Sequence, residues 1–270
     1  MSAAASASET ALQRARGEVA LAVKRRGDAT VLDRLRQAGS AKAHLPRGIG
    51  CEAVLLNTAG GLTGGDRFAW RAEAAEGCDL TLTTQAAERV YRSAGGAAEV
   101  EATLTLAAGA RLDWLPQETI LFDGGALRRS LTVEMAEDAR LLAVEPLVLG
   151  RAAMGETVRG AFLRDAWRVR RGGQLVYADA LRLCGDVQAL TGLAAALGGA
   201  RACATLLWVA PDAPDRLDAM REALGTEGGA SAWDGRLVAR VIAADGAALR
   251  AVLLRAMAVL RPAPPRAWTI

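Results

Sequence analysis

Short segments in which apolar and polar residues alternate recur along the middle of this chain. In residues 78–85 leucines and threonines alternate, and residues 99–106 repeat the pattern. Alternation with a period of two is typical of a strand that buries one face. We expect further short strands at residues 18–24, 31–37, 111–115, 131–135, 140–144, 166–170, 175–178 and 236–243. The chain is therefore predicted to be mostly β.

Glycine supplies the turns that many short strands require. The chain has 29 glycines among 270 residues, more than the usual share of about 7%. Gly172-Gly173 separates two alternating runs. This predicts a hairpin, because tight hairpin turns need positive φ angles. Residues 38–50, which carry His44 and Pro46, are expected to form a loop.

Helical periodicity is confined to the C-terminal half. Helices are predicted at residues 187–197, 215–224 and 247–260, the last with Asp245 as its N-cap. No Pro/Gly/Ser-rich linker divides the chain. We therefore expect a disordered Ala/Ser-rich leader at residues 1–16, followed by a single domain over residues 17–270.

Composition argues against several classes of function. The net charge is only +3, and the basic clusters at residues 24–26 and 168–171 lack interleaved aromatic residues, which disfavours nucleic-acid binding. One histidine and four widely spaced cysteines disfavour a closed zinc site and suggest reduced thiols. Without a signal peptide or a membrane-spanning segment, the protein is expected to be cytoplasmic.

The glycine-rich run at residues 57–66 resembles a phosphate-binding loop at first sight. A P-loop would need Lys and Ser or Thr after its last glycine, but Asp66 stands there. The spacing of a dinucleotide-binding loop is also absent. The alternative is structural: paired glycines permit tight turns, and Asp66 could accept hydrogen bonds from backbone N–H groups.

Several blocks on either side of this run carry a family resemblance. They follow one another in order over roughly residues 45–185. The blocks are Cys51–Phe68 around the glycine run, Thr83–Ser93, Leu112–Phe122, Glu145–Arg151 with Met154–Glu156, and Arg164–Val169 before the Gly172-Gly173 hairpin. Together they resemble the UreD/UreH family of urease accessory proteins.

The resemblance implies a fold and a role. The fold would be mostly β, with layered, β-helix-like sheets and two or three α-helices in the C-terminal half. The role would be that of a maturation chaperone in nitrogen metabolism rather than an enzyme. Members bind apo-urease with the partners UreF and UreG, and they help to deliver nickel to the active site, with an internal tunnel as the proposed route. No permanently bound cofactor is implied, only transient Ni²⁺.

The residue types are compatible with transit of a metal. Nitrogen and sulfur ligands hold nickel tightly, whereas carboxylates and carbonyls hold divalent ions more loosely. Asp66 is therefore the first candidate for a transit ligand. The second candidates, taken from the matched blocks, are Glu145, Glu156 and Asp165, although Glu156 or Asp165 could simply pair with Arg151, Arg164 or Arg168.

Other residues in the matched blocks have weaker assignments. Thr83, Thr84 and Gln85 are candidates to line the tunnel, or else strand residues that face solvent. Tyr91 and Arg92 are candidates to anchor a partner, because aromatic and arginine residues dominate interface hot spots. The tryptophans Trp114, Trp167 and Trp208 are expected in the core, and His44 in a loop.

Two other functions stay open at this stage. One is an enzyme on a layered β scaffold, such as a polysaccharide lyase or hydrolase, with Asp113, Glu118 and Asp123 as candidate acid/base groups. The other is a purely structural interaction protein with no metal passage.

Overall fold

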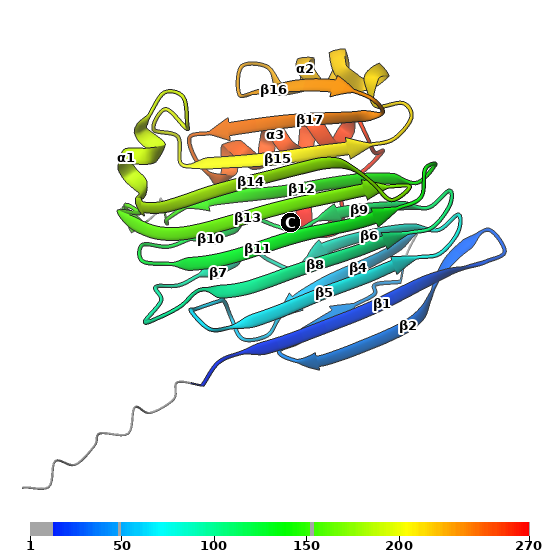
Figure 1. The fold of residues 1–270 in the computed structure, drawn as a ribbon, viewed down its shortest axis with the longest axis horizontal. Helices are drawn as coiled ribbons and strands as arrows, with labels where there is room; N and C mark the ends of the chain where they lie inside the picture. Colours follow the sequence, from blue (N-terminus) through cyan, green and yellow to red (C-terminus); the bar gives the residue numbers. More distant parts are fainter. Residues whose placement is uncertain (1–12, 48–49, 152–153, 270) are drawn as a thin grey trace, which may run out of the picture.

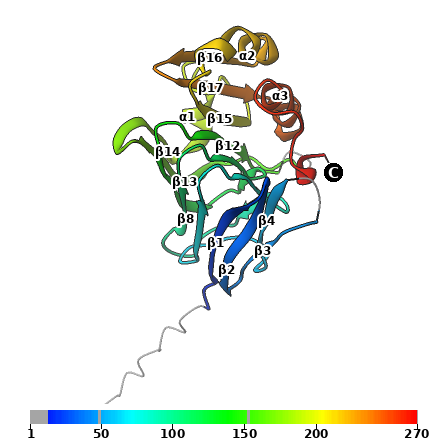
Figure 2. The ribbon, with the colours of Figure 1, turned by 90° about the vertical axis from the view of Figure 1, so that its right-hand side faces the viewer.

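The computed structural model describes residues 13–47, 50–151 and 154–269, which form two facing β-sheets with helices on one side (Figures 1 and 2). The seven-stranded sheet has the order β14 (Gln174–Asp186), β13 (Gly160–Arg171), β11 (Ala126–Met135), β8 (Ala98–Leu106), β5 (Arg67–Ala74), β1 (Arg16–Arg26) and β2 (Ala29–Gly39).

The ten-stranded sheet has the order β16 (Gly228–Trp233), β17 (Arg236–Ala243), β15 (Ala202–Val209), β12 (Arg140–Leu149), β9 (Arg111–Leu115), β6 (Asp79–Thr84), β4 (Cys51–Asn57) and β3 (Ala41–His44). In Figure 1 part of the ten-stranded sheet lies behind the seven-stranded sheet, and its strands β15, β17 and β16 extend above it. The short strands β7 (Glu88–Val90) and β10 (Thr119–Leu121) pair with each other, and β10 also pairs with β12.

The chain winds as a solenoid through the centre of the molecule. It crosses from one sheet to the other at almost every turn, in the order β4, β5, β6, β8, β9, β11, β12 and β13. Strands of successive coils are therefore parallel neighbours: β5, β8, β11 and β13 in one sheet and β4, β6, β9 and β12 in the other. Antiparallel strand pairs close both ends, which limits the exposed parallel edges.

Two apolar cores follow from this arrangement. The larger lies between the sheets, where alternate residues of each strand point inward, among them Leu104, Leu131 and Val133. The second lies between the outer face of the ten-stranded sheet and the C-terminal helices. There α3 (Gly246–Ala258) buries Leu249 and Leu253, and Asp245 caps its N-terminus by accepting from the N–H of Ala248 at 2.9 Å.

The remaining helical segments are short. They are α1 (Val187–Gly192), α2 (Leu217–Leu224) and the 3₁₀ turns at Pro214–Arg216 and Arg266–Trp268. Within the described residues, no helix combines the length and the apolar character that crossing a membrane would require.

The glycine-rich run forms tight turns. Gly60, Gly61 and Gly65 have positive φ angles of 81°, 145° and 90°. A Cβ on Gly61 would lie 2.3 Å from the ring of Tyr91 and 2.9 Å from the carbonyl of Arg89. Backbone from the next coil therefore packs directly on this glycine, which explains why a residue without a side chain is needed at position 61.

The mostly β class, the layered sheets and the C-terminal helices are confirmed. Strands were predicted at the positions of β9 and β17 with the correct bounds, and the Gly172-Gly173 hairpin is present with both φ angles positive. The leader predicted at residues 1–16 lies mostly outside the described residues, although Arg16 already begins β1.

Other predictions were wrong in detail. The loop predicted at residues 38–50 contains β3, whose four residues pair with β4 in the sheet. The helix predicted at residues 187–197 ends at Gly192. The strands β4, β5 and β15 were missed, because their apolar residues are too continuous or too rich in alanine to show clean alternation.

Candidate functional site: two charged cavities between the sheets

A buried ion cluster lies between the two sheets. Arg129 of β11 points inward, and its Nε lies 3.1 Å from Oε2 of Glu145 on β12. Its Nη2 lies 2.5 Å from Oδ2 of Asp165 on β13, and its Nη1 donates to the Thr119 hydroxyl at 3.0 Å. Each of the three charged residues is less than 10% exposed. Because so little of the cluster is exposed, the positive charge of Arg129 must offset the carboxylates beside it.

Two tryptophans complete the surroundings of Glu145. The Trp114 indole donates to Oε1 at 2.9 Å, and the Trp167 indole donates to Oε2 at 3.0 Å. Burial, together with the nearby Asp165 carboxylate, raises the pKa of Glu145 above its ordinary value, although the charge of Arg129 and the two indole donors oppose this rise. For Arg129, burial lowers the pKa, but the carboxylates of Asp165 and Glu145 outweigh this and raise it above its ordinary value.

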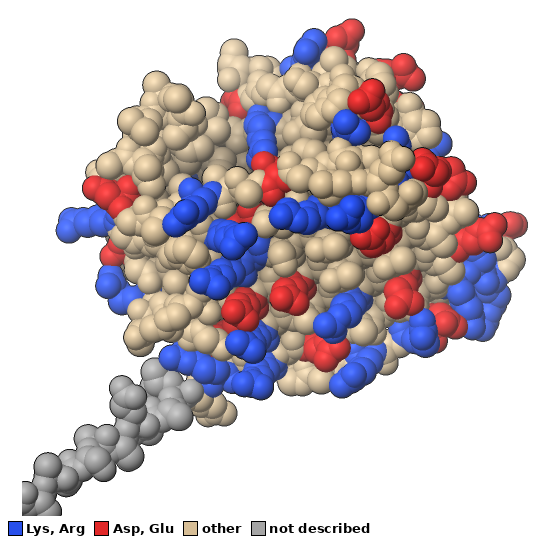
Figure 3. Space-filling view, viewed as in Figure 1, with Lys and Arg blue, Asp and Glu red and all other residues tan. Residues whose placement is uncertain are grey.

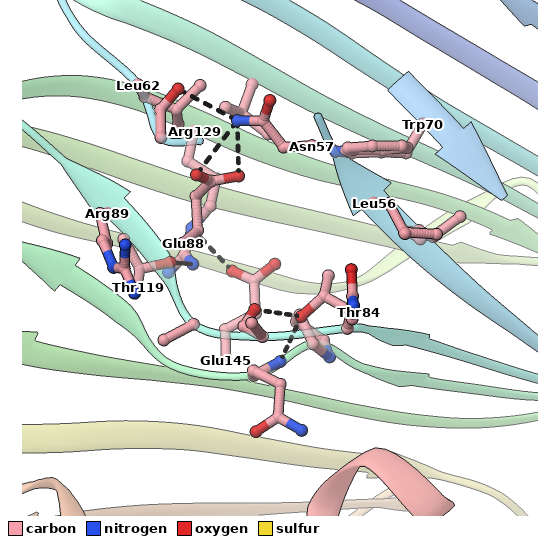
Figure 4. Close-up of a pocket in the computed structure, with 18 of the residues that line it drawn as sticks. Leu56, Asn57, Leu62, Trp70, Thr84, Glu88, Arg89, Thr119, Arg129 and Glu145 are labelled. Atoms are coloured by element: carbon pink, nitrogen blue, oxygen red, sulfur yellow. Dashed lines mark hydrogen bonds and ion pairs between the residues drawn. The ribbon is translucent and has the colours of Figure 1, made fainter. Parts of the chain in front are cut away.

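A first cavity of about 190 Å³ opens on one side of this cluster. Figure 4 shows its walls, which come from both sheets and from the loop that carries β7. Polar groups line one part of it and Trp70, Leu127 and other apolar side chains line the rest. Its polar lining comprises Asn57, Thr84, Gln85, Glu88, Arg89, Gln117, Thr119, Arg129 and Glu145.

Glu88 is the acidic residue at the other end of this cavity. Asn57 Nδ2 lies 3.2 Å from each of its carboxylate oxygens and also donates to the Gly61 carbonyl at 3.1 Å. Burial raises the pKa of Glu88 to about 7, and the hydrogen bond from Asn57 opposes this rise. At neutral pH this carboxyl is therefore close to half ionised.

A second cavity of about 230 Å³ lies on the other side of the cluster, between β13 and β14 and the strands β15 and β17. Arg129 and Glu145 line both cavities. Asp165 and Asp179 line the second, where Arg240 lies 2.5 Å from Asp179. The buried Oδ1 of Asp165 has no hydrogen-bond partner among the described residues. Such an oxygen is available to a cation.

Among the four sequence-predicted transit ligands, the structure brings Glu145 and Asp165 together around Arg129. Asp66 is buried elsewhere, in the glycine-rich turn. Its Oδ1 accepts from the N–H of Ala15 at 2.7 Å and its Oδ2 from the N–H of Thr63 at 2.8 Å. Asp66 does not line either cavity, so its contacts match the structural alternative.

Glu156 lies apart from the cluster, in a hollow of about 520 Å³. It pairs with Arg151 at 2.8 Å, as the structural alternative also anticipated. Tyr91 and Arg92 line the same hollow, and Arg92 pairs with Asp123 at 2.6 Å. The two partner-binding candidates thus share a surface with one of the metal candidates.

The predicted tunnel-lining residues divide in the same way. Thr84 and Gln85 line the first cavity. Thr83 is buried and donates to the Leu115 carbonyl at 2.7 Å. Trp114, Trp167 and Trp208 are in the core as expected. His44 is an exposed strand residue, not a loop residue, and within the described residues no group of three His, Cys, Asp or Glu side chains could hold a metal.

The acidic residues proposed for an enzyme each have an arginine partner. Asp113 pairs with Arg111 and Arg261, Glu118 with Arg250, and Asp123 with Arg92. Asp113 lies on β9, whereas Glu118 and Asp123 lie in the loops before and after β10, and the three do not line a common cavity among the described residues. This arrangement gives no support to an acid/base pair.

Two residues of the site were missed at the level of sequence. Arg129 lies between Leu127 and Leu131 on the core-facing side of β11, so a charge at an inward position was a visible signal. Glu88 carries no comparable signal, because it follows a loop and the hydrogen bonds to its carboxylate come from Asn57 of another strand.

The fold and the site together define a class: a two-sheet β-solenoid with a charged interior between its sheets. A family model described as UreD urease accessory protein matches residues 15–269. The urease accessory protein UreD of Methylobacterium sp. (strain 4-46) is 52% identical over 268 residues, which cover 95% of each chain. That of Rhizobium leguminosarum bv. trifolii (strain WSM2304) is 49% identical over 269 residues, covering 98% of each chain. This chain belongs to the UreD family of urease accessory proteins.

Proposed function

We propose that this chain is a non-catalytic urease maturation factor that binds apo-urease together with UreF-like and UreG-like partners and guides Ni²⁺ through its interior. The observation that supports a route between the sheets is the pair of cavities that share Arg129 and Glu145. The route would run from Glu88 past this pair to Asp165. The proposal places the protein in the cytoplasm, where four free thiols are usual.

The chemistry of the lining suits a cargo better than a resident metal. The cavities offer carboxylate, hydroxyl and amide oxygens, which hold divalent cations more loosely than histidine or thiolate ligands do. The cysteine that lines the second cavity, Cys203, has its pKa raised to about 11 by burial, so its thiol stays protonated. A protonated thiol is a poor ligand, so the cost of deprotonating Cys203 disfavours it as a resting place for Ni²⁺.

Arg129 would control passage in this proposal. Its guanidinium stands where the two cavities meet and repels another cation. Movement of Arg129 away from Glu145 and Asp165 would expose two carboxylates at once. A partner that draws Arg129 aside would therefore open the route and create its ligands in one step.

The test is reconstitution from purified components. The chain, its two partners, apo-urease and Ni²⁺ are combined, and both co-elution and the urease activity gained are measured. Asp165→Asn should lower activation while every complex still assembles. Asp218→Asn, an exposed change on α2, is the matched control. Asp66→Asn tests the other route, through the glycine-rich turn.

Each outcome separates the alternatives. If no partner co-elutes with the chain, the maturation role itself fails. If the complexes form but neither Asp165→Asn nor Glu145→Gln changes activation, nickel does not pass between the sheets. The chain would then be an interaction scaffold without a metal passage, unless Asp66→Asn alone lowers activation.

A further inference from the structure

Arginine side chains gather on the outer face of the seven-stranded sheet. Arg128 of β11, Arg164 of β13 and Arg182 of β14 are direct neighbours in register, so they form a row across three strands. Arg168 lies further along β13, and all four are exposed. Figure 3 shows blue side chains gathered over these three strands. We call these four residues the arginine face.

Two of the three acidic residues that face outward on β8 and β11 are already paired, and the third, Glu101, lies opposite Ser130 and forms no ion pair with a described residue. Glu99 is the cross-strand neighbour of Arg128, but it pairs with Arg67 at 3.1 Å. Glu134 of β11 pairs with Arg170 at 3.5 Å. Within the described part of the chain, no member of the arginine face forms an ion pair. Like charges directly opposite one another in a sheet are destabilising.

The other half of the same sheet face shows a different pattern. Arg71 pairs with Glu18, Arg34 with Glu73, and Arg67 with Glu99. Figure 3 accordingly shows red and blue intermixed below the arginine face. In one half of the sheet face the arginines thus pair with glutamates, while in the other half the arginine face is left free to bind an acidic partner.

We infer that the arginine face is a docking surface for an acidic segment of a protein partner. Adjacent strands are about 4.8 Å apart, and side chains at i and i+4 of a helix are about 5–6 Å apart. The row of Arg128, Arg164 and Arg182 therefore matches carboxylates along one face of a helix. Guanidinium groups bind carboxylates with two parallel hydrogen bonds, which adds specificity to the charge attraction.

A protein segment fits this surface better than a nucleic acid or a lipid bilayer. The row spans three strands, or about 10 Å, which is short for the phosphate track of a duplex. Phe162 lies in the next row, but Arg128 already covers its ring at 5.6 Å, so no stacking platform is open. The acidic residues below the patch would repel an extended polyanion.

The probe for this test is a fluorescein-labelled helical peptide with glutamates at i, i+4 and i+7, and a glutamine version of the same peptide. Binding is followed by fluorescence anisotropy at low salt. The intact chain should bind the glutamate peptide, and the combined variant R128Q/R164Q/R182Q should bind it about 10-fold to 100-fold more weakly. Salt should weaken binding to the intact chain.

The control carries the same change of net charge on the other half of the face. The variant R34Q/R36Q/R71Q, which leaves the Arg67–Glu99 pair beside Arg128 intact, should bind the glutamate peptide as the unmodified chain does. All six side chains are exposed, and thermal melts check that both variants fold. Equal weakening in the two variants would reduce the effect to net charge and overturn the inference. Tighter binding of a DNA duplex or of phosphatidylserine vesicles than of the peptide would overturn it as well.

Discussion

Arg129 of β11 and Glu145 of β12 meet across the interior of the solenoid, with Nε and Oε2 3.1 Å apart. One residue comes from each sheet, so their ion pair joins the two layers at the point where the cavities meet. A buried ion pair of this kind seldom stabilises a protein more than a well-packed apolar pair would. A role of this ion pair at the meeting point of the two cavities explains its presence in the core better than a contribution to stability does.

Removing the positive charge alone should be costly. Arg129→Met keeps much of the side-chain volume but leaves Glu145 and Asp165 buried without their partner. We expect the free energy of unfolding to fall by about 3–5 kcal/mol, measured by urea denaturation at pH 7. Arg128→Met, one residue away on the exposed side of the same strand, should change it by less than about 0.5 kcal/mol. Similar losses of stability in both variants would mean that Glu145 and Asp165 do not need the positive charge of Arg129.

Much of the fold was predictable because the solenoid depends on local alternation. In β8 and β11 every second residue enters the core, and this pattern is directly visible in the sequence. The winding path was not derivable from the residues, because parallel pairing joins segments that are far apart in the chain and no local signal records their register. The layered, β-helix-like expectation came from the family resemblance.

The site was predictable only in part. Glu145 and Asp165 were chosen because they lie in blocks that resemble the family, and the structure places them in one cluster. Asp66 and Glu156 were chosen by the same criterion, yet their oxygens are occupied by backbone N–H groups and by Arg151. Sequence position does not reveal whether a carboxylate already has a partner, since partners come from other coils.

The glycine-rich turn offers a sharp test of packing. Gly61→Ala should lower the free energy of unfolding by about 2–5 kcal/mol, because a Cβ would collide with neighbouring backbone and φ is in a region that only glycine tolerates. Gly60→Ala is the matched control, since a Cβ there meets nothing within 4 Å. Its expected cost is about 1–2 kcal/mol, from its positive φ alone. Equal costs at the two positions would show that the collision at Gly61 is relieved.

Glu88 should make stability depend on pH. Its pKa is 4.5 ordinarily and about 7 in the folded protein, so the folded state binds a proton more tightly than the unfolded state does. The stabilisation of the folded state by the protonated Glu88 is therefore fully present below pH 4.5, and it is lost as the pH rises through about 7. Glu88→Gln mimics the protonated form, so its free energy of unfolding relative to the unmodified chain should rise between pH 5 and pH 8. We expect a rise on the order of 2 kcal/mol.

Urea denaturation of the metal-free chain at both pH values measures this difference. Glu101→Gln, which removes an exposed carboxylate of β8, is the control for the loss of one negative charge. A pH-independent difference for Glu88→Gln would contradict the assignment. It would mean that Asn57 and the cavity water solvate the carboxylate as well as bulk water does.

Trp114 and Trp167 should be coupled energetically through Glu145. Replacing either indole by phenylalanine removes one hydrogen bond to a buried carboxylate and should cost about 1.5–3 kcal/mol. In Glu145→Gln the charge is gone, so the same replacements should cost less. Double-mutant cycles should then give coupling energies of about 0.5–3 kcal/mol.

Trp208→Phe is the matched control, because its indole lies 3.3 Å from Asp212 in the other core. Its effect should add to that of Glu145→Gln without coupling. Additive effects for Trp114 and Trp167 would mean that Glu145 is held by Arg129 alone, and that the two indoles serve only to fill the core.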